Sequence, residues 1–311
     1  MFVNYSIIIP HHNIPKLLKR CLHSIPIRND LQIIVVDDCS DEKYKKDLYS
    51  LEKEYSHVEF YYSDICKGGG AARNIGLNHA IGRYVLFADA DDFFNYCIYD
   101  ILDEFINEQC DIVFFNANSI DTDTYLPRNR INHLNNMHEL YKKNANKSII
   151  SLKYLYGEPS CKLVKKELIV KNQIIFDETR IHNDTKFSYM IGFYAKEVKV
   201  DHRAIYCLTD RSNSVSKNNS HQAQLIRTKI FAEKNKFLKD HQIPAFDDIM
   251  IWPFRDYFSV KNMKYFQECL HIINQYDYSL GFILKKIAIA NSKTKIRRIG
   301  NKIGRYFHRY F

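Results

Sequence analysis

The segment Gly82–Phe94 reads GRYVLFADADDFF, an apolar run followed by an acidic cluster. Residues 84–88 are β-branched, aromatic or small apolar side chains, which suit a short buried strand and are too few for an ordinary helix. The run stops at three acidic residues, Asp89, Asp91 and Asp92. Three carboxylates at the end of a buried strand repel one another, so they are costly unless a cation neutralises them.

This acidic cluster predicts a divalent metal site. Carboxylate oxygens suit the hard ions Mg²⁺ and Mn²⁺, and two carboxylates leave room in the metal's shell for substrate phosphates. A phosphorylated substrate is therefore expected. The alternative is that Asp91 and Asp92 cap a helix that begins near Asn95, because Asp is favoured at helix starts.

Strands and helices alternate through the first part of the chain. The pattern predicts strands at 6–9, 32–36, 58–62, 84–88 and 111–115, and helices at 14–24, 70–80 and 98–106. This order is typical of βαβ units in a parallel sheet. Polar residues follow three strands, at 10–13, 37–40 and 89–92. Ligands bind outside such strand ends in open α/β sheets, so these groups are expected to share one crevice.

The second part of the chain is less regular. Residues 116–147 are rich in Asn, Asp and His and are predicted to be irregular, either a mobile loop near the site or a surface excursion. A strand and a short helix are expected in 161–170, an amphipathic helix after Asp184, and in 204–216 a strand that leads into a loop rich in Ser and Asn. The pattern then becomes helical. We therefore predict two domains, 1–216 and 217–311.

The composition is that of an ordinary globular protein, with 46% hydrophobic and 26% charged residues. No run of about 18 apolar residues is present, and the N-terminus lacks the features of a signal peptide. A cytoplasmic location is expected. The eight cysteines form no CxxC pair, so a zinc site or a dense disulfide framework is not expected and most should be free.

The net charge of +9 belongs to the C-terminal tail. No acidic residue follows Asp277, whereas nine basic residues do: Lys285, Lys286, Lys293, Lys295, Arg297, Arg298, Lys302, Arg305 and Arg309. Apolar and basic residues of 296–310 fall on different faces of a helix, which suits peripheral binding to an anionic membrane. The alternative is packing on the chain's own domain or on a second subunit in a homo-oligomer. Nucleic-acid binding is disfavoured because no reader motif accompanies the charge.

Several polar residues near the predicted strand ends are candidates for ligand binding. Residues 67–76 (KGGGAARNIG) lack the GxGxxG spacing of a dinucleotide site, so we interpret Gly68 to Gly70 as a close backbone approach to a ligand. Arg73 offers a fork of donors for phosphate or a base, and a surface salt bridge is its alternative. Of Asp37 and Asp38, one is expected to bind ligand and the other to cap the turn at Ser40.

The adjacent histidines His11 and His12 and the single residue Asp184 are weaker candidates when each is taken alone. His11 and His12 are adjacent, so they are interpreted as polar lining rather than as a metal pair. Asp184 precedes an amphipathic helix, and taken alone it is better explained as an N-cap than as a catalyst.

The ordered set SIIIPHHN, IIVVDDCS, GGGAARNIGL, GRYVLFADADD and HNDTKF resembles the family 2 inverting glycosyltransferases over about residues 4–216. The resemblance implies the GT-A fold, an α/β, mostly parallel sheet with helices on both faces, here with a helical C-terminal extension. It also divides the first domain into a nucleotide-sugar half, about 1–116, and an acceptor half, about 117–216.

The resemblance also implies residue roles. It assigns the nucleotide pocket to Pro10, His12, Asn13, Asp38, Arg73 and Asp89, the Mg²⁺ or Mn²⁺ to Asp91 with Asp89, and the general base to Asp184. Asn183 stands before that base, where the family often has an acidic residue.

These roles imply transfer of a sugar from a nucleotide sugar, UDP-linked, to a hydroxyl of a glycan or lipid-linked acceptor in surface polysaccharide or glycolipid synthesis. The alternatives are a nucleotidyltransferase, or a noncatalytic sugar- or membrane-binding protein that retains the fold.

Overall fold

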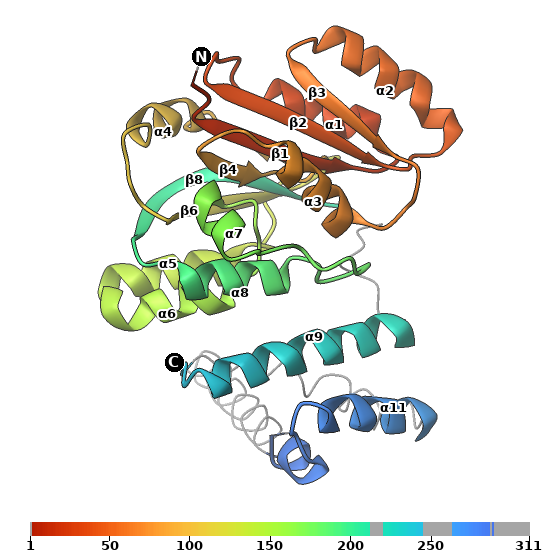
Figure 1. Cartoon of the computed structure of the whole chain (residues 1–311), viewed down its shortest axis with the longest axis vertical. Helices are drawn as coiled ribbons and strands as arrows, with labels where there is room; N and C mark the ends of the chain where they lie inside the picture. The colour runs from red at the N-terminus through yellow and green to blue at the C-terminus, as the bar shows by residue number, and fades with distance from the viewer. Residues whose placement is uncertain (1, 212–219, 245–262, 287, 289–311) are drawn as a thin grey trace, which may run out of the picture. The chain divides into compact units, whose positions relative to one another are not determined.

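The computed structural model describes residues 2–211, 220–244, 263–286 and 288 (Figure 1). The chain divides into two compact units, Met1–Asn218 and Asn219–Phe311. The predicted boundary at residue 216 and the amphipathic tail at 296–310 both lie outside the described residues. Each unit contains a hydrophobic cluster of its own.

In the described part of the first unit, eight strands form one sheet in the order β3-β2-β1-β4-β7-β6-β8-β5 (Figure 1). The strands are β1 (Tyr5–His11), β2 (Leu31–Asp38), β3 (Val58–Ser63), β4 (Tyr84–Phe87), β5 (Phe93–Phe94), β6 (Ile112–Asp121), β7 (Lys162–Lys165) and β8 (Val198–Asp210). Neighbours from β3 to β4 are parallel, as are β6 and β8, whereas β7 and β5 pair antiparallel. The predicted α/β, mostly parallel sheet is confirmed.

The winding of the chain reverses between β1 and β4. Helices α1 (Pro15–His23) and α2 (Glu42–Glu54) lead from β1 to β2 and then to β3, and α3 (Gly69–His79) returns to β4 on the other side of β1. Because such crossovers are right-handed, α1 and α2 cover one face of the sheet and α3 covers the other (Figure 1). The crevice at this reversal is where ligands bind in open α/β sheets.

An aromatic cluster ties β4 to the second half of the sheet. The ring of Phe87 lies 5.0 Å from Phe176 and 5.3 Å from Phe187, and the last two rings stack at 4.0 Å. Phe187 belongs to α8 (Thr185–Tyr194). All three side chains are fully buried. The end of β4 and the start of α8 therefore have fixed relative positions.

The loop predicted at 116–147 is wrong. β6 continues to Asp121, and α5 (Asn132–Lys143) and α6 (Ala145–Leu155) follow. The asparagines in this segment lower its intrinsic helix propensity, but the buried side chains of Leu134 and Leu152 hold the helices against the core. Tertiary packing therefore overrides the polar composition here.

The remaining helices are short in the first unit and long in the second. In the first they are α4 (Ile98–Glu104) and α7 (Lys166–Lys171). In the second, α9 (His221–Asp240) and α11 (Met263–Asn274) pack through Phe231, Tyr265 and Cys269. Among the described residues, no helix combines the length and the apolar character needed to cross a bilayer.

The fully buried His138 of α5 makes folding sensitive to acid. Its ring lies 5.8 Å from the ring of His202 and 5.9 Å from that of Tyr156. Burial, with a smaller effect of His202, lowers the pKa of His138 from 6.5 to about 4. The unfolded chain therefore binds this proton first, and stability is lost as the pH falls from about 6.5 towards 4.

We predict that His138→Leu removes about 2 kcal/mol of the acid-induced loss of stability near pH 5, since each pKa unit corresponds to about 1.4 kcal/mol. Urea unfolding near pH 7.5 and near pH 5 measures this difference. The same substitution at the exposed His57 should leave the pH dependence unchanged. Equal acid sensitivity in wild type and His138→Leu would contradict the assignment.

Candidate active site

The ends of β1 and β2 are cross-linked by polar groups. His12 Nδ1 lies 2.8 Å from the carbonyl oxygen of Asp38. The backbone N–H of Asn13 donates to Ser40 Oγ, and its side-chain oxygen accepts from the N–H of Asp41, both at 2.8 Å. Asn13 has a φ of 59°, in the left-handed region that Asn tolerates well. The structure thus brings Pro10, His12, Asn13 and Asp38 to one edge of the sheet.

Asp37 and His11 support this edge from inside. Asp37 accepts hydrogen bonds from the N–H and the hydroxyl of Ser40, so the predicted turn cap is confirmed for this residue. His11 Nε2 accepts the N–H of Ile14, which places the ring proton on Nδ1, 2.7 Å from Asp37. His11 is 2% exposed. Its interpretation as polar lining is therefore wrong, because it lies beneath the surface and holds the loop.

The segment before α3 is fastened to the end of β2 at two adjacent points. The carboxylate of Asp38 accepts the N–H groups of Lys67 and Gly68 at 3.0 and 2.8 Å. A disulfide joins Cys39 to Cys66, with 5.1 Å between their Cα atoms. The other six cysteines are free, so a single bridge takes the place of a dense framework.

The glycines on both sides of Arg73 serve close packing of the chain on itself. A Cβ added at Gly70 would lie 2.1 Å from the carbonyl oxygen of Asp177, and one at Gly76 would lie 2.4 Å from Ile8 Cγ2. Gly68 has a φ of +94°, which favours glycine. The interpretation of Gly70 as an approach to ligand is therefore wrong. This glycine lets α3 meet the 177–183 loop.

Arg73 connects the two sides of the crevice. Its guanidinium donates to Asp89 Oδ1 at 2.5 Å through NH2 and to Asn183 Oδ1 at 2.9 Å through NH1. It also lies over the ring of Phe176, 5.4 Å from the centroid. Arg73 is only 7% exposed. The surface salt bridge weighed for it from the sequence is wrong, since the side chain is a buried bridge between β4 and the residue before Asp184.

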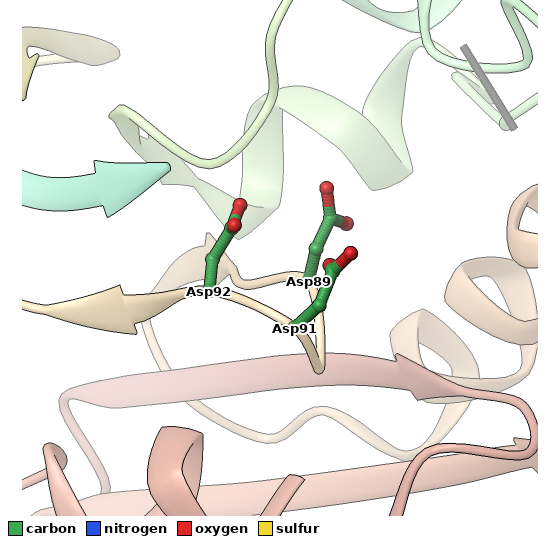
Figure 2. Close-up of side chains that lie close together, drawn as sticks. All are labelled: Asp89, Asp91 and Asp92. Carbon is green, nitrogen blue, oxygen red and sulfur yellow. The ribbon is translucent and has the colours of Figure 1, made fainter. Parts of the chain in front are cut away.

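The acidic cluster begins two residues after the end of β4, and Figure 2 shows the carboxylates of Asp89, Asp91 and Asp92 close together. Ligand oxygens of Asp89, Asp91 and Asp92 lie within 4.8 Å of one another. Asp91 Oδ2 lies 2.8 Å from Arg211 Nε, and the buried Asp92 accepts the N–H of Thr209 at 2.7 Å. The helix-capping alternative is wrong, because β5 intervenes and α4 begins at Ile98 with Cys97 at its N-cap.

The electrostatics of this cluster suit a cation. Burial and the charge of Asp89 raise the pKa of Asp91, and burial with its two neighbours raises that of Asp92. The cluster therefore holds more negative charge than its surroundings balance. Hard oxygen donors at this spacing fit Mg²⁺ or Mn²⁺. Asp89 and Asp91 would hold the ion, while one oxygen of Asp92 is used by β8.

Asp184 stands at the N-cap position of α8, but its side chain makes no capping hydrogen bond. The N-cap role weighed for it is therefore wrong. Burial raises the pKa of Asp184 to about 6, with Arg73 opposing and Glu158 and Asp89 reinforcing the change. A carboxylate with a pKa close to neutrality is well matched to accepting a proton.

Three residues of this region escaped the sequence analysis. Glu158 and His133 approach each other at 3.5 Å, and Arg211 reaches Asp91. None of these residues belongs to a motif, and each contact joins segments far apart in the chain. Only the folded structure brings them to the acidic cluster and to Asp184.

The family model described as "Glycosyl transferase family 2" matches residues 6–171, more than half of the chain. The chain belongs to glycosyltransferase family 2. The relatives include the glycosyltransferase EpsJ of Bacillus subtilis, 27% identical over 68% of this chain and 62% of EpsJ. They also include the poly(ribitol-phosphate) β-N-acetylglucosaminyltransferase TarS of Staphylococcus aureus, 24% identical over 67% of this chain and 36% of TarS.

Solved structures show the same fold. Residues 1–349 of S. aureus TarS, in complex with UDP-GlcNAc, match with a TM-score of 0.63 at 20% identity, covering 88% of this chain and 80% of that one. A mannosyltransferase of Pyrobaculum calidifontis with GDP-Man and Mn²⁺ matches with a TM-score of 0.52 at 13% identity, covering 95% and 81%. The GT-A fold expected for this family 2 chain is confirmed.

The glycines of α3 provide a matched stability test. We predict that Gly70→Ala lowers the free energy of unfolding by roughly 1–3 kcal/mol, because the new methyl group overlaps the backbone of Asp177. Gly69→Ala meets only the end of Arg73 at 3.4 Å, so its stability should change by less than about 0.5 kcal/mol. Urea unfolding compares the two. Equal losses would show that α3 does not pack as described.

Proposed function

We propose that this family 2 chain is a metal-dependent, inverting glycosyltransferase. It would move a sugar from a nucleotide sugar, UDP-linked, to a hydroxyl of a glycan or lipid-linked acceptor in surface polysaccharide or glycolipid synthesis. The observation that carries the proposal is the Arg73 bridge. The guanidinium of Arg73 joins Asp89, the first residue of the acidic cluster, to Asn183, which directly precedes Asp184.

The reaction uses the two sides of this bridge. Asp184 takes the proton of the acceptor hydroxyl, and the oxygen forms a bond to the anomeric carbon as the bond to the nucleoside diphosphate breaks on the opposite face. The configuration inverts. A bound divalent cation would neutralise negative charge on the departing diphosphate. Arg73 holds Asp89 in place, and its positive charge would lie beside the phosphates of a bound donor.

The proposed donor is inferred from the polar residues at the C-terminal ends of β1 and β2 and from the nucleotides bound by a relative. Asp38, His12 and Asn13 form one polar edge beside the glycine-rich segment, where a nucleobase and ribose would lie. TarS is described in complex with UDP-GlcNAc and with UDP. These observations support a uridine nucleotide.

The cellular site is part of the same proposal. The basic C-terminal tail, which lies outside the described residues except for Lys285 and Lys286, suits an anionic membrane surface at the cytoplasmic face. A lipid-linked acceptor would be presented there.

The proposed mechanism predicts the effect of replacing Asp184. We expect Asp184→Asn to lower turnover by about 10²- to 10⁴-fold, because it removes the proton acceptor. Thermal stabilisation by UDP with Mn²⁺ should remain. In wild type, kcat/KM should fall tenfold per pH unit below about 6, because the base must be ionised. Release of UDP at a series of pH values measures both effects.

A noncatalytic protein would behave differently. In that case Asp184→Asn would change nothing, and wild type would release no UDP above the rate without protein.

The proposed metal site predicts different effects for substitutions of Asp91 and Asp92. Asp91→Asn should abolish the Mn²⁺-dependent part of the thermal shift with UDP-sugar, because a metal ligand is lost. Asp92→Asn should retain most of it, since the amide oxygen can still accept the N–H of Thr209. Differential scanning fluorimetry with Mn²⁺ and with chelator gives the comparison. Equal loss in both variants, or no shift in wild type, would contradict the metal assignment.

A further inference from the structure

The acidic cluster lies on a short turn between β4 and β5. The N–H of Asp92 donates to the carbonyl of Asp89 at 2.9 Å, which makes residues 89–92 a β-turn. Carboxylate oxygens of its three acidic residues lie within 4.8 Å of one another and repel. One hydrogen bond across a turn offers little resistance to such repulsion, so contacts from other elements are needed to keep these carboxylates together.

Strand β8 supplies such contacts at Asp91 and Asp92. β5 and β8 pair antiparallel, with Phe93 opposite Cys207. Continuing this register places Thr209 opposite Asp91. The hydroxyl of Thr209 donates to the carbonyl of Asp91 at 2.7 Å, and its N–H donates to Asp92 Oδ1 at 2.7 Å. Thr209 is fully buried. One residue of β8 thus holds two consecutive residues of the turn.

Arg20 of α1 completes the hold on Asp91. A terminal nitrogen of its guanidinium donates to the same carbonyl at 2.5 Å, and the group lies over the ring of Phe93, 5.3 Å from the centroid. A carbonyl oxygen has two lone pairs, so Thr209 and Arg20 together use both. The peptide plane that follows Asp91 is therefore fixed, which limits the directions open to its side chain.

Tyr206 of β8 holds the other predicted metal ligand. Its phenol oxygen accepts the N–H of Asp89 at 2.7 Å, and its ring lies 5.1 Å from that of Phe94. Tyr206, like Thr209, is fully buried. Because both side chains are withdrawn from solvent, removing either hydroxyl leaves a backbone group of the turn without that partner.

We propose that Tyr206 and Thr209 are positioning residues for the metal ion. They hold the backbone of the acidic turn so that the carboxylates of Asp89 and Asp91 converge before the ion binds. This inference rests on the metal-dependent transfer proposed above and adds to it the residues that set the affinity for the ion. Ligands that are held together in advance need not be drawn together against their own repulsion when the ion binds. Both residues act through the backbone of the turn and not as ligands.

The test uses the full chain and measures the half-effective Mn²⁺ concentration, which gives half of the maximal thermal stabilisation at saturating UDP. Thr209→Val removes the hydroxyl and keeps the N–H that binds Asp92. Tyr206→Phe removes the acceptor of the Asp89 N–H. Each should raise the half-effective Mn²⁺ concentration roughly tenfold to hundredfold, as is typical when a group that orients a metal ligand is lost. Thr209→Ser keeps the hydroxyl and should stay close to wild type.

The same titration separates positioning from a general loss of stability. At saturating Mn²⁺ the thermal shift with UDP should return to that of wild type in both variants, because the ligands themselves are unchanged. A role in stability alone would lower the melting temperature without metal and leave the half-effective Mn²⁺ concentration unchanged.

Two buried residues of the same types are the matched controls. The hydroxyl of Tyr5 in β1 donates to the carbonyl of Leu102 at 2.7 Å, and that of Thr228 in α9 donates to the carbonyl of Gln224 at 2.8 Å. Both side chains are buried. Tyr5→Phe and Thr228→Val each remove a buried hydrogen bond away from the acidic turn. They should therefore lower stability without changing the half-effective Mn²⁺ concentration.

Should Thr209→Val fail to fold, Arg20→Lys replaces it, because this substitution keeps the positive charge and removes the fork that reaches the same carbonyl. It should also raise the half-effective Mn²⁺ concentration. Values equal to that of wild type in Tyr206→Phe and in the Thr209 or Arg20 variant overturn the proposal. Failure of the proposed function gives a different result, namely a wild type with no Mn²⁺-dependent shift at all, and this inference then falls with it.

Discussion

The buried guanidinium of Arg73 is the interaction on which the crevice depends. One of its terminal nitrogens engages Asp89 after β4 and the other engages Asn183 before α8, while its plane lies over Phe176. A planar fork with fixed donors can hold two acceptors at a defined separation, which a lysine cannot. The aromatic cluster of Phe87, Phe176 and Phe187 makes this geometry rigid from below.

The neutrality of Asn183 gives this bridge its charge balance. An acidic residue at position 183 would compete with Asp89 for the single positive charge of Arg73. It would also place a further negative charge beside Asp184. With an amide, the charge of Arg73 serves Asp89 and Asp184. Elsewhere in the crevice, Arg211 lies against Asp91 and His133 against Glu158. The site is thus acidic overall, because Asp89 and Asp184 share Arg73 while Asp91 and Glu158 each face a cationic side chain of their own.

Local patterns in the sequence predicted most of the strands and the polar groups at their ends, because they depend on periodicity and on where strands end; the strand order, with its reversal between β1 and β4, was not predicted. The helices in 132–155 were missed, because they are held in place by the burial of Leu134 and Leu152 in the core, which the local sequence does not show. The roles of His11 and Gly70 were wrong for a related reason. Asp37 contacts His11 from about 26 residues away, and Asp177 contacts Gly70 from about 107 residues away. Local sequence patterns do not predict contacts between such distant segments.

The bridge between Cys39 and Cys66 spans 27 residues and encloses α2 and β3 in a covalent loop. Closing a loop of that size lowers the entropy of the unfolded chain by an amount worth about 3–4 kcal/mol at 25 °C in the chain-entropy model. The stability of the β2 edge is therefore tied to the redox poise of the compartment that holds the protein. Where glutathione keeps thiols reduced, the covalent link is absent and hydrogen bonds such as those of Asp38 fasten the glycine-rich segment to β2.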